Sequence, residues 1–220
     1  MPFAYPVMLE VANRRCVVIG DDAVREGKVE GLIAAGATDV LVVAEGPAAR
    51  LDELDPVEGV TIERRRWHAD DLNGAALVLG ASRDAGERAA IAREARCRRA
   101  LVNVIDDIPQ CDFAAPGVVR RGELLLAIGT GGSSPTLARV IRERLEHSYG
   151  PEWAEVLQIL REVRDRTKPS LPSFEERAAR WHAALDPDEA ASLVREGRGD
   201  ELRARLIERL VGDDLEAEHP

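Results

Sequence analysis

The residues best suited to chemistry stand at the end of a buried apolar run. Ala100 to Ile105 is short, unbroken and rich in β-branched side chains, which is typical of a central parallel strand. Asp106 and Asp107 follow it directly. Open α/β sheets bind ligands at the carboxyl ends of their strands, and partial desolvation there would raise a carboxylate's proton affinity. The pattern therefore indicates a general base at Asp106, with an ordinary aspartate loop cap as the structural alternative.

A glycine-rich turn supplies the second candidate group. Gly129 to Pro135 reads Gly-Thr-Gly-Gly-Ser-Ser-Pro. Ser134 is a good N-cap and Pro135 suits the first position of a helix, so a helix is predicted to begin here. Amide groups at such a helix start attract anions. The Thr130 hydroxyl adds hydrogen-bonding capacity beside them.

The elements that must position these groups form a strand–helix–strand unit. The unit consists of a strand at Arg15 to Ile19, a turn at Gly20, a helix at Asp21 to Ala35 and a strand at Val40 to Ala44. Further strands at 61–66, 77–81 and 100–105 and a helix at 85–98 continue the alternation. We therefore expect an α/β fold with a Rossmann-type parallel sheet, followed by a β-hairpin at 113–128 and a small C-terminal helical domain.

Several motifs, taken in order, resemble one family. They are Tyr5-Pro6-Val7, Val17 to Gly20 leading to Lys28, Asn103 to Asp107, Cys111 to Phe113, and Gly131 to Pro135 followed by Leu137 to Arg139. The chain thereby resembles the precorrin-2 dehydrogenase / sirohydrochlorin ferrochelatase family, the N-terminal half of siroheme synthase. The resemblance is strong over the first two-thirds of the chain. The helical remainder matches only in its position and helical character.

The resemblance implies an enzyme with a defined set of site residues. Asp106 is the implied acid for both steps, NAD-dependent dehydrogenation of precorrin-2 and insertion of ferrous iron into sirohydrochlorin. The implied cofactor-binding residues are Gly20, Ala23, Val24, Glu45, Gly46 and Ser82. The implied residues for binding the tetrapyrrole substrate are Asn103, Arg121, Thr130, Gly131, Gly132, Ser133 and Ser134. No metal ligands are implied, because the macrocycle itself supplies the nitrogen ligands for iron.

The first turn departs from the family, whose members usually carry three consecutive glycines there. This chain has Gly20-Asp21-Asp22 instead. Two carboxylates would repel a pyrophosphate, although acids in the first turn of a helix also stabilise it. Glu45, at the end of the second strand, could bind an adenosine ribose and favour NAD over NADP, or simply open a surface loop.

Composition limits the partners. The chain has 220 residues and a formal net charge of −10, which argues against nucleic-acid binding. It lacks an apolar run long enough to cross a membrane and an N-terminal signal pattern, so a cytoplasmic protein is expected. Its three cysteines are widely spaced, which supports neither disulfides nor a zinc site. Lys28, Arg120, Arg121 and Arg139 are candidate partners for substrate carboxylates.

The predicted organisation has four parts. They are a dinucleotide-binding domain at 1–112, a dimerisation and tetrapyrrole-cleft region at 113–149, a helical domain at 150–212 and a disordered tail at 213–220. The family's hairpin region forms a homodimer, so a homodimer is expected here. Three functions remain open: both activities of the family, metal insertion alone with the NAD site lost through Asp21 and Asp22, or non-catalytic tetrapyrrole binding.

Overall fold

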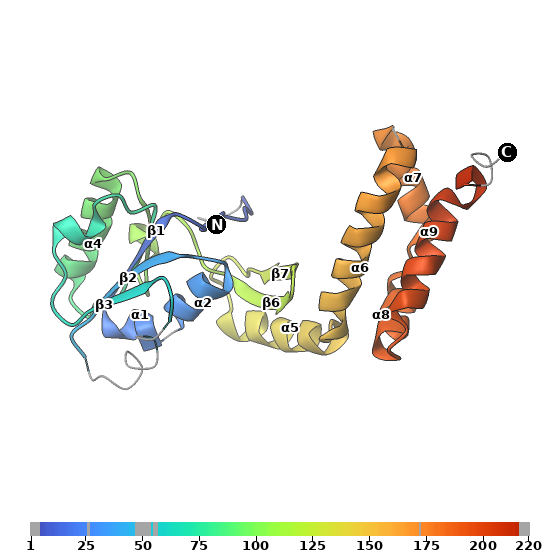
Figure 1. Cartoon of the computed structure of the whole chain (residues 1–220). Helices are drawn as coiled ribbons and strands as arrows, with labels where there is room; N and C mark the ends of the chain where they lie inside the picture. The colour runs from blue at the N-terminus through green and yellow to red at the C-terminus, as the bar shows by residue number, and fades with distance from the viewer. Residues whose placement is uncertain (1–4, 26, 47–53, 55–56, 172, 216–220) are drawn as a thin grey trace. The chain divides into compact units, whose positions relative to one another are not determined.

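Five short strands form one parallel sheet in the computed structural model, which describes residues 5–25, 27–46, 54, 57–171 and 173–215. The sheet order is β3-β2-β1-β4-β5 (Figure 1). All four neighbouring pairs are parallel. The predicted Rossmann-type sheet is confirmed, and its strands are β1 (Arg15–Ile19), β2 (Asp39–Val43), β3 (Val60–Glu63), β4 (Leu77–Gly80) and β5 (Leu101–Val104).

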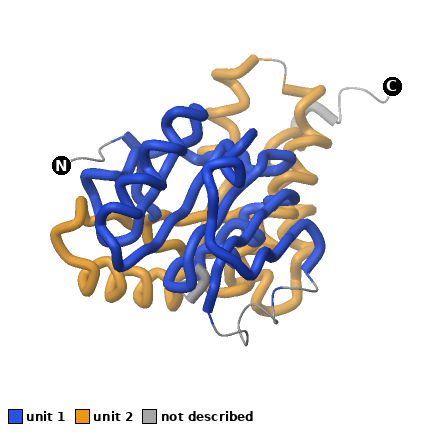
Figure 2. Tube along the Cα trace, turned by 90° about the vertical axis from the view of Figure 1, so that its left-hand side faces the viewer, with its two compact units in different colours: residues 1–115 blue, residues 116–220 orange. Residues whose placement is uncertain are grey.

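The chain divides into two compact units, residues 1–115 and 116–220 (Figure 2). The first contains the parallel sheet. The second begins with an antiparallel hairpin, as the Gly122 turn predicts. Its elements are β6 (Gly117–Arg121), β7 (Leu124–Ile128), α5 (Pro135–Ser148), α6 (Glu152–Thr167), α7 (Phe174–Ala184), α8 (Pro187–Arg195) and α9 (Gly199–Leu215).

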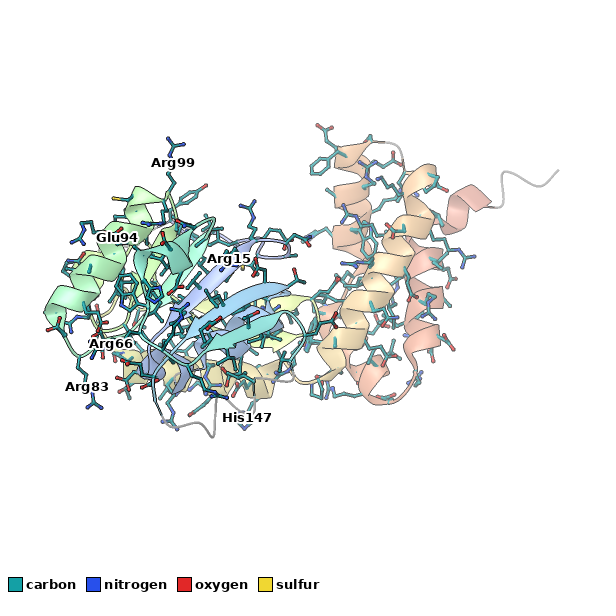
Figure 3. All side chains as sticks on the ribbon, turned by 60° about the vertical axis from the view of Figure 1, so that its left-hand side comes forward. Arg15, Arg66, Arg83, Glu94, Arg99 and His147 are labelled. Atoms are coloured by element: carbon teal, nitrogen blue, oxygen red, sulfur yellow. The ribbon has the colours of Figure 1, made fainter. Side chains whose placement is uncertain are left out.

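Labelled arginines mark the two ends of the parallel sheet. Arg15 lies where β1 begins, whereas Arg66 and Arg83 lie at the opposite end, where the strands finish (Figure 3). Short 3-10 helices occur in the loops, namely η1 (Ala69–Leu72), η2 (Ile108–Gln110) and η3 (Lys168–Ser170). In the ranges that the structure describes, no helix is long and apolar enough to cross a membrane.

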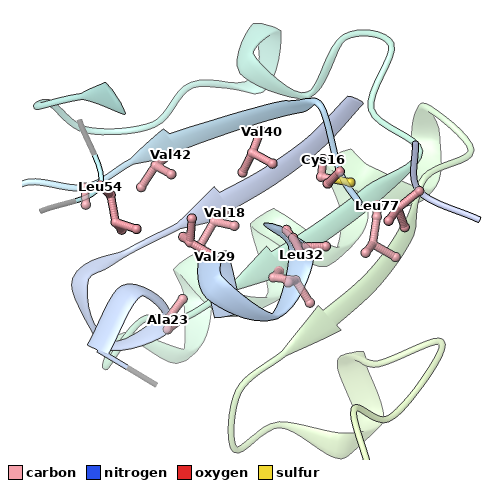
Figure 4. Close-up of a cluster of buried hydrophobic side chains, with 14 residues drawn as sticks. Cys16, Val18, Ala23, Val29, Leu32, Val40, Val42, Leu54 and Leu77 are labelled. Carbon is pink, nitrogen blue, oxygen red and sulfur yellow. The ribbon is translucent and has the colours of Figure 1, made fainter. Parts of the chain in front are cut away.

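Alternating strand residues build a core on each face of the sheet. On one face, Val18, Val40 and Val42 pack with Val29 and Leu32 of α2 (Lys28–Ala34) (Figure 4). On the other face, alternate residues of the same strands pack with α4 (Ala85–Cys97). Their side chains are almost fully buried and aliphatic, so hydrophobic burial fixes both the register of the sheet and the direction in which its strand ends point.

The predicted single helix at Asp21 to Ala35 is wrong. The structure contains α1 (Asp21–Arg25) and then α2, with Gly27 between them in the left-handed conformation at φ +72°. Glycine adopts this conformation without the steric penalty that a Cβ brings, so it breaks the helix. The first turn after β1 therefore opens a helix of only five residues.

The helices α6 to α9 of the second unit share one core. Buried aliphatic residues of α6, α8 and α9, such as Ile159, Leu193 and Leu206, form it together with residues of the α6–α7 connection. The helix α9 continues to Leu215, past residue 212, where the helical domain is predicted to end. Of the predicted tail at 213–220, residues 216–220 lie outside the described residues.

Candidate active site

The candidate site lies where neighbouring parallel strands end. The strand order reverses between β1 and β4, and this is where open α/β sheets bind their ligands. Gly20 follows β1 with φ +91°, and a Cβ there would overlap the carbonyl oxygen of Ala81 after β4. Only glycine allows the two strand ends to approach this closely. Gly20 therefore fits the role predicted for the first turn of a dinucleotide-binding domain.

Asp106 lies at the same carboxyl end of the sheet, two residues past the last residue of β5. It is an exposed residue with φ +59°, in the left-handed region. Among the residues that the structure describes, none forms a hydrogen bond or ion pair with its carboxylate. The predicted partial desolvation is wrong for this unit, because the chain turns away from the sheet at once and leaves the side chain in solvent. An unpaired, accessible carboxylate remains able to accept a proton from a bound substrate.

Residues on either side of Asp106 are held in place. The Ile105 N–H donates to the Gly80 carbonyl at 2.8 Å, and the Asp107 N–H donates to the Val104 carbonyl at 3.2 Å. The Cys111 thiol accepts the Val104 N–H at 3.2 Å and lies 3.1 Å from the Val104 carbonyl oxygen. Burial raises the pKa of the Cys111 thiol. Cys111 is therefore a neutral hydrogen-bonding group within the loop.

Asn103, a predicted substrate-binding residue, uses its amide within the loop. Its Nδ2 donates to the Phe113 carbonyl at 2.8 Å. Next to it, Asp112 accepts the Val102 N–H at 3.1 Å and pairs with Arg96 at 2.9 Å. These contacts cover part of β5, which is an edge strand. A substrate role for Asn103 stays a prediction.

In the first turn, Asp21 makes a side-chain contact that a glycine could not make. The Asp21 Oδ1 accepts a hydrogen bond from the Gly46 N–H at 2.7 Å. A Cβ at Gly46 would overlap the Asp21 carboxylate, so the two groups are in close contact. Asp21 thus bridges the ends of β1 and β2, which lie beside each other in the sheet. A pyrophosphate approaching the first turn would meet this carboxylate, and the Asp21–Gly46 hydrogen bond would have to break.

Exposed arginines lie beside the other acids of this edge. Glu45 lies 3.4 Å from Arg66, and Asp22 lies 4.0 Å from Arg83. Both arginine side chains extend into solvent (Figure 3), where such pairs are weak. Glu45 therefore remains accessible to a ribose hydroxyl.

The remaining predicted cofactor residues lie in α1 and just before α4. Ala23 is fully buried in the core, and Val24 lies in α1. The Ser82 hydroxyl donates to Glu87 and accepts the Asp84 N–H at 3.1 Å at the start of α4. Gly20, Gly46 and Ser82 nevertheless all lie at the ends of neighbouring strands, as predicted.

The second unit contains the other predicted substrate residues. Thr130 and the glycines at 131 and 132 precede α5, and the two glycines have φ +61° and +80°. Ser133 N–H donates to the Thr130 carbonyl, and Ser134 accepts the Leu137 N–H at 3.1 Å. The predicted N-cap and the helix beginning at Pro135 are confirmed.

Arg121, a predicted substrate-binding residue, donates hydrogen bonds to backbone carbonyl groups near the end of α5. Its Nε donates to the Tyr149 carbonyl at 2.8 Å and its Nη2 donates to the Glu146 carbonyl at 3.2 Å. The guanidinium therefore satisfies carbonyl groups at the C-terminal end of α5. Arg139 pairs with Glu143 at 2.8 Å. Arg120 is exposed at the end of the same strand as Arg121 and makes no side-chain contact with the described residues.

Two models of known protein families match the chain. Residues 7–117 match a family described as putative NAD(P)-binding, and residues 121–148 match the central part of sirohaem biosynthesis proteins. The chain belongs to the precorrin-2 dehydrogenase / sirohydrochlorin ferrochelatase family. This is a family of siroheme-synthesis enzymes, and the family predicted from the motifs is confirmed.

Individual relatives agree with this family. The chain is 34% identical over 215 residues to siroheme synthase 1 of Pectobacterium atrosepticum and 30% identical over 203 residues to siroheme synthase of Methylococcus capsulatus. These matches cover 98% and 92% of this chain, but only 44% and 42% of the relatives. The chain therefore spans less than half the length of these relatives.

A solved structure of the family has the same fold. It is described as SirC, precorrin-2 dehydrogenase, and is 25% identical with a TM-score of 0.67. The match covers 92% of this chain and 98% of that one. The parallel sheet, the hairpin and the helices that follow are therefore shared within the family.

Proposed function

We propose that this chain acts on a tetrapyrrole in siroheme biosynthesis, with Asp106 as the group that accepts protons from it. The full proposal has two reactions, dehydrogenation of precorrin-2 to sirohydrochlorin with NAD and insertion of ferrous iron to give siroheme. The observation that carries it is the exposed Asp106 carboxylate just after β5 in an NAD(P)-binding domain, which forms no hydrogen bond or ion pair with any described residue. The family's dehydrogenase member supports the first reaction.

Asp106 would perform the same elementary step in both reactions. In dehydrogenation, a C–H bond of precorrin-2 breaks with loss of a hydride, and a proton leaves the neighbouring atom to the carboxylate. In metal insertion, ferrous iron forms bonds to the pyrrole nitrogens, and two N–H protons are released. A carboxylate in solvent contact can pass each proton to water and return to its basic form.

Bound NAD would supply the hydride acceptor for the first reaction. The strand order, the Gly20 turn and the accessible Glu45 fit a dinucleotide. Asp21 fits only after it releases the Gly46 N–H. Glu45 would bind a ribose hydroxyl and would repel a 2′-phosphate, which favours NAD over NADP.

One observation favours a second candidate, metal insertion without dehydrogenation. The Asp21 carboxylate occupies the Gly46 N–H, and Asp22 adds a second charge in the same turn. Both carboxylates would repel a bound pyrophosphate, whereas neither takes part in proton transfer at Asp106. In this case the substrate would be sirohydrochlorin made by a separate oxidation.

The second unit would bind the carboxylates of the macrocycle. The turn at 130–134 precedes a helix of 14 residues, and Arg120 provides an exposed guanidinium on the hairpin that pairs with none of the described residues. Exposed apolar side chains of the hairpin and α5 support a homodimer formed through this region, among them Val118, Leu137 and Val140. The cytoplasm stays the predicted location.

The test follows the absorption spectrum of the protein with each substrate. We expect sirohydrochlorin and ferrous iron to give siroheme, and precorrin-2 with NAD to give sirohydrochlorin. Asp106→Asn should lower both rates by about 10²- to 10⁴-fold, the usual contribution of a general base. Insertion without dehydrogenation would select the second candidate. A wild-type rate in Asp106→Asn would remove Asp106 from the chemistry, and no reaction in the wild type would leave only tetrapyrrole binding.

A further inference from the structure

The backbone at Asp106 is in a conformation that its surroundings must maintain. A residue with a Cβ adopts φ near +59° at a steric cost, and such residues persist when neighbouring contacts hold them. The Asp106 side chain forms no hydrogen bond or ion pair with the described residues that could do this. The contacts that fix the direction of its carboxylate must therefore belong to its neighbours.

Arg88 of α4 makes one set of these contacts. Its Nε donates to Asp107 Oδ2 at 2.9 Å, and its Nη1 donates to the carbonyl oxygens of Ser82 and Arg83 at 3.0 and 3.2 Å. The guanidinium thus joins the loop after β4 to the loop after β5. The side chains of Arg88 and Asp107 are only 23% and 19% exposed, so solvent screens this pair less than a surface ion pair.

Cys111 closes the same loop from its other end. Its thiol lies 3.3 Å from the Asp107 carbonyl oxygen, in addition to its contacts with both backbone groups of Val104. Asp107 is therefore held through its side chain by Arg88 and through its backbone by Cys111. Asp106 lies between this doubly held residue and Ile105, which is hydrogen-bonded to β4.

We propose that Arg88, Asp107 and Cys111 are positioning residues that aim the Asp106 carboxylate. The expected effect on catalysis rests on the proposed function, whereas the expected effect on the conformation of the loop does not. Arg88 lies outside all of the sequence motifs, whereas Asp107 and Cys111 belong to motifs that assign them no part in positioning Asp106. A side chain that is misdirected by about 1 Å can cost a hundredfold in rate, so this arrangement would control turnover without contact with the substrate.

Another arginine ion pair, at the C-terminal end of α4, provides a matched control. Arg98 lies 2.9 Å from Glu94, with exposed fractions of 22% and 25%, and Arg98 also donates to the Glu94 carbonyl. Glu94 is labelled on α4 in Figure 3. This pair resembles Arg88–Asp107 in distance and burial but lies toward the other end of the helix. Removing it should affect stability to a similar extent without touching the Asp106 loop.

The experiment compares Arg88→Gln, Arg88→Lys and Arg98→Gln in the full chain. Two readouts are measured, the kinetics of metal insertion into sirohydrochlorin and the hydrogen exchange of the Asp107 and Cys111 amides. Arg88→Gln should lower kcat about 10- to 100-fold with KM changed by less than about twofold. It should also speed exchange of both amides about tenfold or more. Arg88→Lys should recover part of both, because it keeps the charge but not the fork of donors.

The outcomes separate the two proposals. Wild-type kcat and exchange in Arg88→Gln, or equal effects in Arg98→Gln, would overturn the positioning role. If the wild-type protein inserts no metal, the proposed insertion activity fails, and the exchange comparison alone then decides whether Arg88 holds the loop. A loss that appears in KM rather than kcat would also count against positioning, since it would indicate substrate binding.

Discussion

The Asp21 carboxylate accepts the backbone N–H of Gly46 at 2.7 Å and so joins the ends of the two strands that would hold a dinucleotide. A glycine at position 21 could not make this bridge. The N–H of Gly46 is consequently satisfied within the protein, and a negative charge lies beside the first turn of α1. Cofactor binding must therefore compete with an internal hydrogen bond as well as with charge repulsion.

Replacing both acids of this turn should strengthen dinucleotide binding. We expect Asp21→Gly/Asp22→Gly to bind NAD about tenfold or more tightly than the wild type, because one close charge repulsion alone corresponds to roughly 1 kcal/mol or more. Isothermal titration calorimetry at fixed ionic strength measures the change. The control Glu175→Gln/Asp188→Asn removes two charges from the first turns of α7 and α8 and should leave Kd unchanged. Equal Kd values for all three proteins would show that Asp21 and Asp22 do not limit binding.

Much of the parallel sheet could be predicted from local pattern. The aliphatic strands and the helix that begins at Ser134 follow from hydrophobic runs and capping residues that lie close together in sequence. The break at Gly27 could not be predicted in this way, because the hydrophobic spacing of 21–35 continues through it. Only the backbone conformation of Gly27 reveals that two helices replace one.

The candidate site shows a similar division. Asp106 and Gly20 could be placed at the sheet edge from sequence, because strand ends determine position. Whether the Asp106 side chain is exposed could not be predicted, because exposure depends on which other segments cover the loop. The contact of Arg88 with Asp107 spans 19 residues and two elements, and no spacing rule identifies it. Side-chain partners that are far apart in sequence therefore cannot be predicted from the sequence, even where the positions of their backbones can.

The conformation of Asp106 gives a stability prediction that is independent of catalysis. Asparagine tolerates the left-handed region about as well as aspartate, whereas a β-branched side chain does not. Asp106→Asn should leave the free energy of unfolding within about 0.5 kcal/mol of the wild type, and Asp106→Val should lower it by about 1–2 kcal/mol. Urea denaturation measures both. Equal stability of the two variants would contradict the positive φ at this position.

A buried carboxylate elsewhere in the same unit should make stability depend on pH. Asp71 is 8% exposed and accepts two hydrogen bonds from Arg65, at 2.9 and 2.8 Å. Its carboxylate also accepts the His68 N–H at 2.8 Å, so it holds the start of η1. Mainly because Arg65 donates these bonds, the pKa of Asp71 lies below its usual value.

Acid should therefore remove the contribution of Asp71 to stability. The folded pKa lies below that of the unfolded chain, about 3.9, so the contribution is complete above roughly pH 5 and is lost as the pH falls through the folded pKa. We expect Asp71→Asn to lower the free energy of unfolding by about 1–3 kcal/mol at pH 7, and the difference from the wild type to shrink below about pH 4. The control is Asp39→Asn, whose partner Arg15 lies 3.5 Å away at an exposed position and whose loss should cost less than about 1 kcal/mol. Urea denaturation at pH 7, 5 and 3 tests this, and a difference between wild type and Asp71→Asn that stays constant over that range would contradict the lowered pKa.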